Sequence, residues 1–486
     1  MPPGQPNVVL ASCLARLGWS PRVLARRINR LFGPDTVAET APYYWRDRGG
    51  LPRPPVPAMV AWVLTRELGC VVTAAELWQG RADAGPPLLP ADADMQAPWS
   101  RPQTLRLLDD WVTAGLIDRR SFLAISGAAL TTIAAEYLAA EPAAVTSALA
   151  GGGVSGPLLE QIEHSLPFLQ RLDDAHGGGR HLEYVSAQFR AVALIARQRA
   201  DPEATTRRLF AALAELGQLA GWMAVDAGKH GLAQRYLFTA LRAAHQSSHR
   251  PMAAHVLADL GYQAALQQRT GDAVALGEAA RHAARTSTPC VRASVASRLA
   301  YAYVLAGRLD DFDRTRGTAG HAITGSKADP EPAWMYYLTP NHLDTQAGYG
   351  LIHAATLARG PENAATARRL ARRGQTLLST GVHDVSLDHS SQRRALFEGA
   401  WLAVGYATSG DLERACHTGR SAVARLDRVA SSRSTEVLHV LAARLRRRGR
   451  NEYVRDFLPD LDSALTRHGM AGHPPLGSTP GTGETP

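Results

Sequence analysis

Lysine is nearly absent from this sequence. Of its 53 basic residues, only Lys229 and Lys327 are lysine, and all the others are arginine. Because alanine and glycine are abundant as well, this bias indicates a GC-rich genome. A single arginine is therefore weak evidence of selected guanidinium chemistry.

Cysteines are few, and long apolar runs are missing. Cys13, Cys70, Cys290 and Cys416 are widely separated and form no CxxC or Cys/His spacing typical of a metal site. We therefore expect reduced thiols in a cytoplasmic protein, and no metal. The N-terminus has no basic segment followed by an apolar run, and no stretch approaches the length of a membrane span. We expect neither a signal peptide nor a membrane partner.

Catalytic motifs are lacking too. The nearest approach to a phosphate-binding loop, residues 320–327, ends in Gly-Ser-Lys, whereas the mechanism needs the lysine before the hydroxyl residue. Neither a Gly-x-Ser-x-Gly elbow nor paired carboxylates stand out. His245, His249 and His255 could place two imidazoles on one helical face, but a metal site needs a third ligand, so we expect surface histidines. The sequence predicts no enzyme and no cofactor.

What is present fits a folded chain of two or three domains. The chain has 486 residues, 45% of them apolar and 20% charged, with a formal net charge of +9. This charge favours an anionic partner without identifying it. Residues 1–80 hold nine arginines against five acidic residues, which modestly supports nucleic acid as that partner.

The stretch from Trp19 to Arg53 predicts two short helices. Ser20 and Pro21 are suited to the start of the first, and Gly33-Pro34-Asp35 breaks it. The second begins near Thr40, where Pro42 is tolerated in the first turn, and it stops at Gly49-Gly50.

This stretch resembles repressor-type helix-turn-helix domains. Their second helix is similar to GWSPRVLARRIN, and the end of their recognition helix is similar to YYWRDRGGLPR. The resemblance implies a helix in the DNA major groove, with Trp45 packed inward. By position, the implied base contacts are Thr40, Ala41, Tyr43 and Tyr44, and the implied backbone contacts are Arg46, Arg48 and Arg53, with Arg22 added from the preceding helix. The connector from Asn29 to Glu39 is longer than usual, and a plain helical hairpin with solvated arginines is the alternative.

The rest of the chain divides by composition. We expect a five-helix DNA-binding domain over residues 8–80, which includes a helix at 57–68 and a capping box at 73–76. Residues 81–104 are rich in Pro, Ala and Asp and predict a linker. Residues 105–465 lack any strand pattern and predict helices, and residues 466–486 predict a disordered tail. The predicted fold class is all-α.

A repeat appears within residues 205–430. Segments 219–241, 260–280, 299–319 and 402–422 each contain small residues, a Gly-containing turn and a second amphipathic helix, with Gly271 and Gly307 as turn glycines 36 residues apart. The segments resemble tetratricopeptide repeats, which implies a superhelical solenoid. Aromatic residues in or near the first helices are candidates for a peptide, small-molecule or protein groove, although core packing is the alternative for each; they are Trp222, Tyr236, Tyr262, Tyr301 and Tyr303.

The two halves together resemble actinobacterial transcription regulators that join a helix-turn-helix to such repeats, most clearly through LAGWMAVDAG and GLAQRY in residues 219–242. The resemblance implies a dimeric regulator of double-stranded DNA, a repressor of development or secondary-metabolite genes. The alternative is a scaffold that has lost DNA binding. A third reading is export through Arg119-Arg120, whose position far from the N-terminus argues against it. For the basic run 444–450 we expect a solvated helix end.

Overall fold

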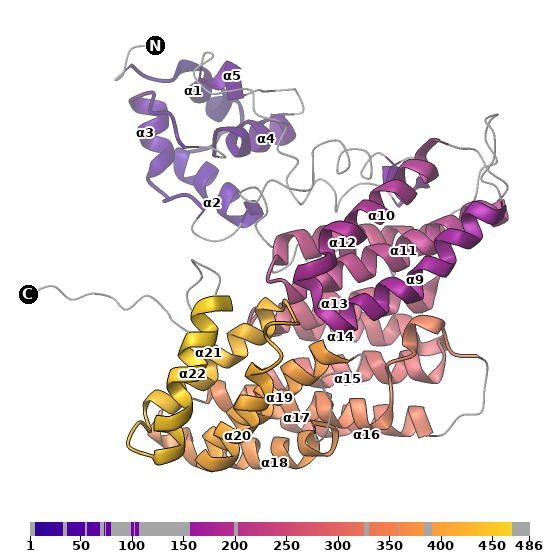
Figure 1. The fold of residues 1–486 in the computed structure, drawn as a ribbon. Coiled ribbons are helices and arrows are strands. Elements are labelled where there is room, and N and C mark those ends of the chain that lie inside the picture. Colours follow the sequence, from indigo (N-terminus) through magenta and orange to yellow (C-terminus); the bar gives the residue numbers. More distant parts are fainter. Residues whose placement is uncertain are drawn as a thin grey trace, which may run out of the picture. The chain divides into compact units, whose positions relative to one another are not determined.

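The computed structural model describes residues 5–32, 36–53, 56–68, 72, 74–78, 99–101, 103–105, 156–198, 203–324, 330–358, 360–382 and 391–468. Within these ranges every regular element is a helix and there is no strand, which confirms the predicted all-α class (Figure 1). The chain divides into two compact units, residues 1–133 and 134–486. Residues 81–98 of the predicted linker (81–104), the Arg119-Arg120 segment and the tail after His468 lie outside the described residues.

The first unit includes α1 (Val8–Arg16), α2 (Pro21–Phe32), α3 (Ala41–Asp47), α4 (Val56–Leu68) and α5 (Ala74–Leu77). Each expected helix is present. One apolar core joins them, to which α4 contributes Met59, Val60, Ala61, Val63 and Leu64. Asn7 ties the start of this unit to its end: its side chain accepts from the Leu10 amide at 2.9 Å and donates to the Leu77 carbonyl at 2.8 Å.

The second unit is a succession of helical hairpins. Its elements are α9 (Gly156–His176), α10 (Gly178–Gln198), α11 (Glu203–Asp226), α12 (His230–Gln246), α13 (Arg250–Leu266), α14 (Thr270–Ala283), η1 (Ala284–Thr286), α15 (Pro289–Leu305), α16 (Leu309–Thr324), η2 (Ala333–Met335), α17 (Pro340–Leu357), η3 (Pro361–Asn363), α18 (Ala364–Val382), α19 (Gln392–Ser409), α20 (Leu412–Val423), α21 (Ser432–Arg446) and α22 (Glu452–His468). From α11 onward, each odd-numbered helix packs against its even-numbered partner and against the next odd-numbered helix. The result is a solenoid, as predicted.

The four repeat segments correspond to the hairpins α11–α12, α13–α14, α15–α16 and α19–α20. One predicted turn residue is wrong. Gly271 lies in the first turn of α14, and the left-handed turn residue of that hairpin is Gln268, with φ of 59°. The turn residues of the first three hairpins, Gly228, Gln268 and Gly307, are therefore 40 and 39 residues apart.

The solenoid curls until its first hairpin meets its last ones. Helix α9 packs against α19 and η2, and α11 packs against α21. Two backbone hydrogen bonds close this seam, from the Ala430 amide to the His176 carbonyl at 2.8 Å and from the Gly179 amide to the Ala430 carbonyl at 2.9 Å. The turn at Gly177–Gly179 is tightly packed, because a Cβ on Gly178 would lie 2.2 Å from the Met223 carbonyl oxygen.

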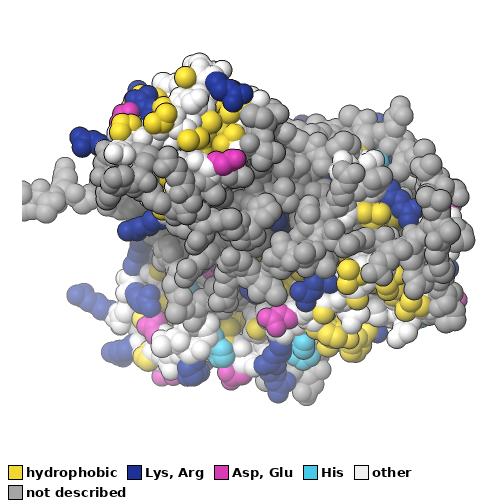
Figure 2. All heavy atoms as spheres, turned by 90° about the horizontal axis from the view of Figure 1, so that it is seen from above, with side chains coloured by type: hydrophobic (Ala, Val, Ile, Leu, Met, Phe, Trp, Pro, Cys, Tyr) yellow, Lys and Arg dark blue, Asp and Glu magenta, His cyan; other side chains and the backbone are white. Residues whose placement is uncertain are grey.

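Arginines are spread over the surface. Figure 2 shows Lys and Arg side chains dispersed among acidic and apolar ones on one face of the molecule. The basic run ends α21 as expected, with Arg447, Arg448 and Arg450 exposed. In the part of the chain that the structure describes, no single helix is long and apolar enough to cross a membrane. The two helices Val8–Arg16 and Pro21–Asn29, which are bent relative to each other, reach the length and apolar composition of a span only when they are counted as one.

Candidate functional site

Helix α3 presents two tyrosines on the surface of the first unit. Tyr43 is 38% exposed and Tyr44 63%, whereas Trp45 is only 5% exposed and packs into the core, as predicted. Thr40 is exposed at the start of the helix but makes no capping hydrogen bond with its side chain, and Ala41 is half-buried. Trp45 thus holds α3 in place while its neighbours remain accessible.

The backbone beyond α3 fixes the direction of Tyr44. A Cβ on Gly50 would lie 2.1 Å from the Tyr44 ring, so the ring lies directly against the glycine backbone. The Gly50 carbonyl in turn accepts a 3.0 Å hydrogen bond from the indole N–H of Trp78. Tyr44 is therefore an exposed side chain on a supported backbone.

The arginines on and after α3 differ in whether they form an ion pair. Arg46 donates to the neighbouring Asp47 at 2.7 Å and lies 5.4 Å from the Tyr43 ring centroid. Although burial opposes it slightly, the hydrogen bond from Arg46 keeps the pKa of Asp47 below its usual value. Arg48 and Arg53 are exposed and make no ion pair with any described residue. These two are the arginines best placed to accept a phosphate.

Arg22 has a structural role that the sequence did not indicate. Together with Arg26 it holds Glu39, which lies two residues before α3. These hydrogen bonds, the one from Arg26 most of all, lower the pKa of Glu39. Asn29 adds two hydrogen bonds of 2.8 Å to the backbone of Val37. The long connector between α2 and α3 is thereby held to α2 at both Val37 and Glu39.

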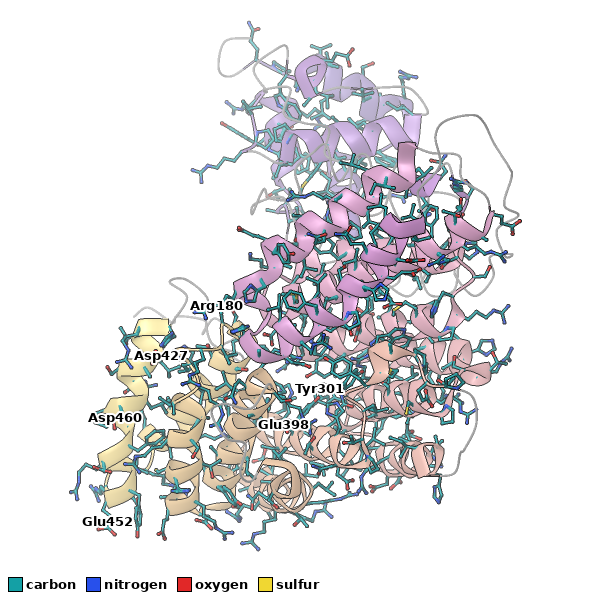
Figure 3. All side chains as sticks on the ribbon, turned by 45° about the vertical axis from the view of Figure 1, so that its right-hand side comes forward. Arg180, Tyr301, Glu398, Asp427, Glu452 and Asp460 are labelled. Carbon is teal, nitrogen blue, oxygen red and sulfur yellow. The ribbon has the colours of Figure 1, made fainter. Side chains whose placement is uncertain are left out.

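A cavity of about 110 Å³ lies inside the solenoid. Its walls come from α9, α11, α13, α15, α17, α19 and α21 and from the segment around η2. Figure 3 shows that Glu398, one of its lining residues, lies in the interior of the solenoid, as does Tyr301, whereas Glu452 and Asp460 are on α22 at the outer edge. Polar and aromatic side chains from these helices converge on it.

Three guanidinium groups surround one indole in this cavity. Arg298, Arg393 and Arg433 lie 5.4, 5.8 and 5.0 Å from the centroid of Trp222. Each guanidinium also has a buried carboxylate partner: Arg298 pairs with Asp259 at 2.7 Å, Arg433 with Asp226 at 3.1 Å, and Arg393 with Asp173 at 3.1 Å.

Asp173 is the least well compensated of these carboxylates. It is 3% exposed, and its Oδ1 atom has no hydrogen-bond partner. Burial raises its pKa to about 7; Asp226 and Asp174 act in the same direction, and Arg393 and Arg433 oppose it. Arg393 is shared, because it also pairs with Asp174 at 2.9 Å.

The histidines contradict one prediction. His245 and His255, expected on the surface, are buried, and His249 is half-buried with its ring nitrogen accepting from the Met252 amide at 3.1 Å. Neighbouring hairpins pack on both sides of α13, so His255 faces Trp334, with the ring centroids 4.9 Å apart. Burial lowers the pKa of His255 and of His342, which lines the same cavity, so both are neutral. Among the described residues no group of three or more His, Cys, Asp or Glu is arranged to hold a metal.

The predicted groove aromatics lie in three different places. Trp222 lines the cavity; Tyr262 lies behind it, 5.7 Å away between centroids, with its hydroxyl accepting from Arg433 at 3.1 Å; and Tyr301 stacks on Tyr262 at 4.8 Å. Tyr236 lies elsewhere, in the core, where it donates to Ser186 at 2.8 Å.

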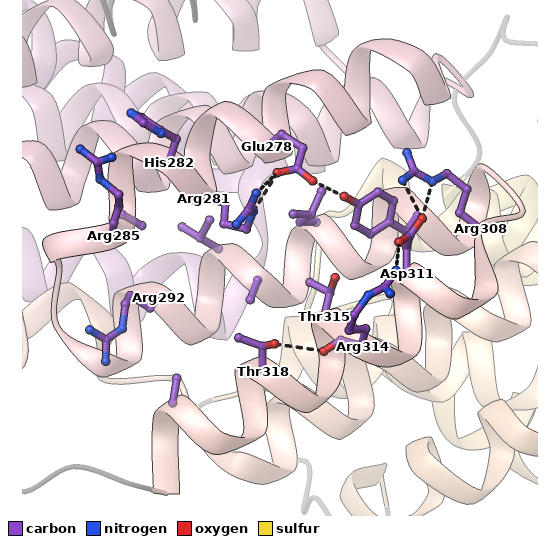
Figure 4. A pocket seen from close by; sticks show the side chains of 16 residues that line it. Glu278, Arg281, His282, Arg285, Arg292, Arg308, Asp311, Arg314, Thr315 and Thr318 are labelled. Carbon is purple, nitrogen blue, oxygen red and sulfur yellow. Dashed lines mark hydrogen bonds and ion pairs between the residues drawn. The ribbon is translucent and has the colours of Figure 1, made fainter.

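The last of the five, Tyr303, lines a different pocket, an open groove of about 660 Å³ among α14, α15 and α16 (Figure 4). Its hydroxyl donates to Glu278, which also pairs with Arg281. Asp311 pairs with Arg308 and Arg314, each three residues away along the chain at the start of α16. Arg285 and Arg292, which also line it, make no ion pair with any described residue, so the groove is positively charged.

Comparison with known proteins gives one local match. A family model described as "SP15 N-terminal domain" matches residues 10–78, which is most of the described first unit. No curated protein matches the chain.

Proposed function

We propose that this protein is a cytoplasmic DNA-binding transcriptional regulator, in which the first unit binds duplex DNA and the solenoid, as a sensor and dimerisation domain, controls the affinity. The observation that carries the proposal is the surface of α3: Tyr43 and Tyr44 are exposed beside Arg48 and Arg53, two arginines without an ion-pair partner among the described residues. Base contacts need accessible hydrogen-bonding side chains on a fixed helix, and phosphates need unpaired cations. Repression of development or secondary-metabolite genes is part of the proposal through the resemblance to regulators of that architecture.

The test is a duplex-binding titration with the full chain. Random duplexes are first enriched by repeated capture on the protein, and the enriched sequence is then measured by fluorescence anisotropy at several salt concentrations. We expect binding that weakens steeply with salt, because neutralised phosphates release their counterions. Failure to retain any duplex at low salt would refute the proposal.

The positively charged groove among α14, α15 and α16 favours a second candidate function, a scaffold that docks an acidic protein segment. A scaffold would retain no duplex at any salt concentration but would co-purify with a protein. That association should be lost on replacing Arg285 and Arg292 by Glu, and kept on replacing the exposed Arg447 and Arg448 on α21 in the same way.

A further inference from the structure

The open groove among α14, α15 and α16 carries an excess of positive charge. Its lining includes two carboxylates, on Glu278 and Asp311. Although burial opposes it, hydrogen bonds from Tyr303 and Arg281 lower the pKa of Glu278. Hydrogen bonds from two arginines of α16 and its start lower the pKa of Asp311, so both carboxylates are ionised at neutral pH. Three positive charges are in excess even without His282, because the lining also includes five guanidinium groups, on Arg281, Arg285, Arg292, Arg308 and Arg314.

Arg285 and Arg292 hold the uncompensated part of this charge. Neither makes a hydrogen bond or an ion pair with any described residue, whereas the other three arginines pair with the two carboxylates. Arg285 lies in η1 and Arg292 in the first turn of α15, where the chain passes from one helix to the next. Figure 4 shows both at one end of the groove and Asp311 at the other. Since Glu278 is bonded to Tyr303, near the opposite end of α15, the free positive charge is separated from both carboxylates.

The floor of the groove offers little apolar surface. It is formed by Val295, Ala296 and Leu299 of α15, which are only 1%, 5% and 1% exposed. A protein helix that docks through its apolar face needs such surface to bury, so it would gain little here. The guanidinium groups are what a ligand reaches, because Arg285 and Arg292 are exposed. The groove therefore suits a ligand that binds by its charge.

A phosphate group matches the free arginines. The forked N–H donors of a guanidinium group bind two phosphate oxygens at once. A phosphate monoester carries about −1.5 to −2 charges at about pH 7, which two guanidinium groups balance. The groove is larger than a phosphate: it has a volume of about 660 Å³, and the residues of α15 from Arg292 to Tyr303 span about 16 Å. Small-molecule sites have volumes of about 300–1,000 Å³.

We propose that the groove among α14, α15 and α16 binds a small organic phosphate, whose terminal phosphate is held by Arg285 and Arg292. The rest of the molecule lies along α15 toward Tyr303 and Asp311, whose oxygens accept hydrogen bonds from its hydroxyl or amine groups. This inference rests on the proposed function only for its consequence, control of DNA affinity by the phosphate ligand.

The experiment is isothermal titration calorimetry of the full chain without DNA, so that its failure is distinguishable from failure of DNA binding. The probes are ADP, AMP and adenosine, which share one skeleton and differ in charge, together with inorganic pyrophosphate and a hexaglutamate peptide. All are measured without divalent cations, at one ionic strength and at about pH 8, where a terminal phosphate is fully charged. We expect ADP to bind with Kd below about 1 mM, and at least about tenfold more tightly than adenosine, with AMP between them.

The other two probes separate a phosphate site from a general anion site. Pyrophosphate should compete with ADP, because both use the same arginines. Hexaglutamate carries more charge but no phosphate, and it should bind at least about tenfold more weakly than pyrophosphate. Equal binding of ADP and adenosine, or no binding of ADP and pyrophosphate, would overturn the proposal. Hexaglutamate that binds more tightly than pyrophosphate would also overturn it, in favour of an acidic protein segment.

Variants locate the site. Arg285→Ala with Arg292→Ala should weaken pyrophosphate binding by at least about tenfold. The matched control is Arg447→Ala with Arg448→Ala, at the exposed end of α21, which should leave the affinity unchanged. All four arginines are exposed, so both variants should fold, and circular dichroism checks this. Unchanged pyrophosphate affinity in the first variant would place the anion elsewhere and overturn the proposal.

A third variant separates the groove from the DNA-binding surface. Arg48→Ala with Arg53→Ala removes the two arginines of the first unit that make no ion pair with any described residue. We expect it to leave the affinity for pyrophosphate unchanged, because the groove belongs to the second unit. Loss of pyrophosphate binding in this variant would assign the anion to the surface of α3 and overturn the groove as its site.

Discussion

Arg393 joins two adjacent carboxylates from the other end of the solenoid, at 3.1 Å to Asp173 and 2.9 Å to Asp174. Arg393 is 220 positions from Asp173 and 219 positions from Asp174 in the chain. Its Nε atom also donates to the backbone carbonyl of Asp173 at 3.2 Å. One side chain thus fastens α9 to α19 and forms part of the cavity wall.

Replacing Arg393 by Ala should therefore destabilise the solenoid strongly. Removing one partner of a buried ion pair leaves the others uncompensated, which costs about 3–5 kcal/mol. The matched control is Arg373→Ala, because Arg373 pairs with Asp313 on the surface, where such a pair contributes about 1 kcal/mol or less. Urea unfolding followed by circular dichroism measures both, and equal effects of the two variants would contradict the role of Arg393 in closure.

Asp173→Asn should stabilise the unliganded protein above neutral pH. The pKa of Asp173 is raised from 3.8 to about 7, so between these values the folded state holds a proton that the unfolded state has lost. Stability contributed by this group is therefore present at low pH and lost as the pH rises through about 7, by up to about 4 kcal/mol.

The measurement is the difference in unfolding free energy between the wild type and Asp173→Asn at several pH values. Taking the difference removes the opposite contribution of surface carboxylates such as Glu39 and Asp311, whose pKa values are lowered. A difference that does not change between about pH 4 and about pH 7 would contradict the assignment of the raised pKa.

On the DNA-binding surface, Tyr44 and the pair Arg48 and Arg53 should respond differently to substitution. Tyr44→Ala should cost about 1–3 kcal/mol on the preferred duplex and little on an unrelated one, because a base contact carries specificity. Arg48→Ala with Arg53→Ala should weaken both duplexes alike and reduce the salt slope by up to about two. Fluorescence anisotropy on both duplexes distinguishes them; Arg447→Ala with Arg448→Ala, at the exposed end of α21, is the control.

Gln268→Gly should stabilise the α13–α14 hairpin. Gln268 has φ of 59°, and the equivalent turn residues of three other hairpins are Gly228, Gly307 and Gly410, with φ of 72°, 75° and 96°. A left-handed conformation costs an L-residue about 1–2 kcal/mol, and glycine avoids this cost. Glycine also has more conformational freedom in the unfolded chain, which offsets part of the gain, so we expect a net stabilisation of about 0.5–1 kcal/mol. Gly307→Ala, where a Cβ would meet nothing within 4 Å, should lose a similar amount through backbone strain alone. Thermal unfolding of the two variants tests the signs.

The sequence by itself determined the all-α class, the helices of the first unit and the hairpins of the solenoid. These follow from local periodicity, caps and breakers: Pro21 starts α2, and Gly33 follows its end. Exposure of Tyr43 and Tyr44, by contrast, was expected only from the resemblance to helix-turn-helix domains, whose recognition helix presents these positions to DNA.

Only the tertiary structure decided where the solenoid's charged residues lie. Asp173, Asp226, Arg298, Arg393 and Arg433 are on five different helices, and no local pattern distinguishes them from solvated charges. His255 was misjudged for the same reason, because the sequence does not show that another hairpin covers its face. Ion pairs across about 200 residues exist because the superhelix curls far enough for α9 to meet α19, and that curvature is the sum of small rotations between many hairpins.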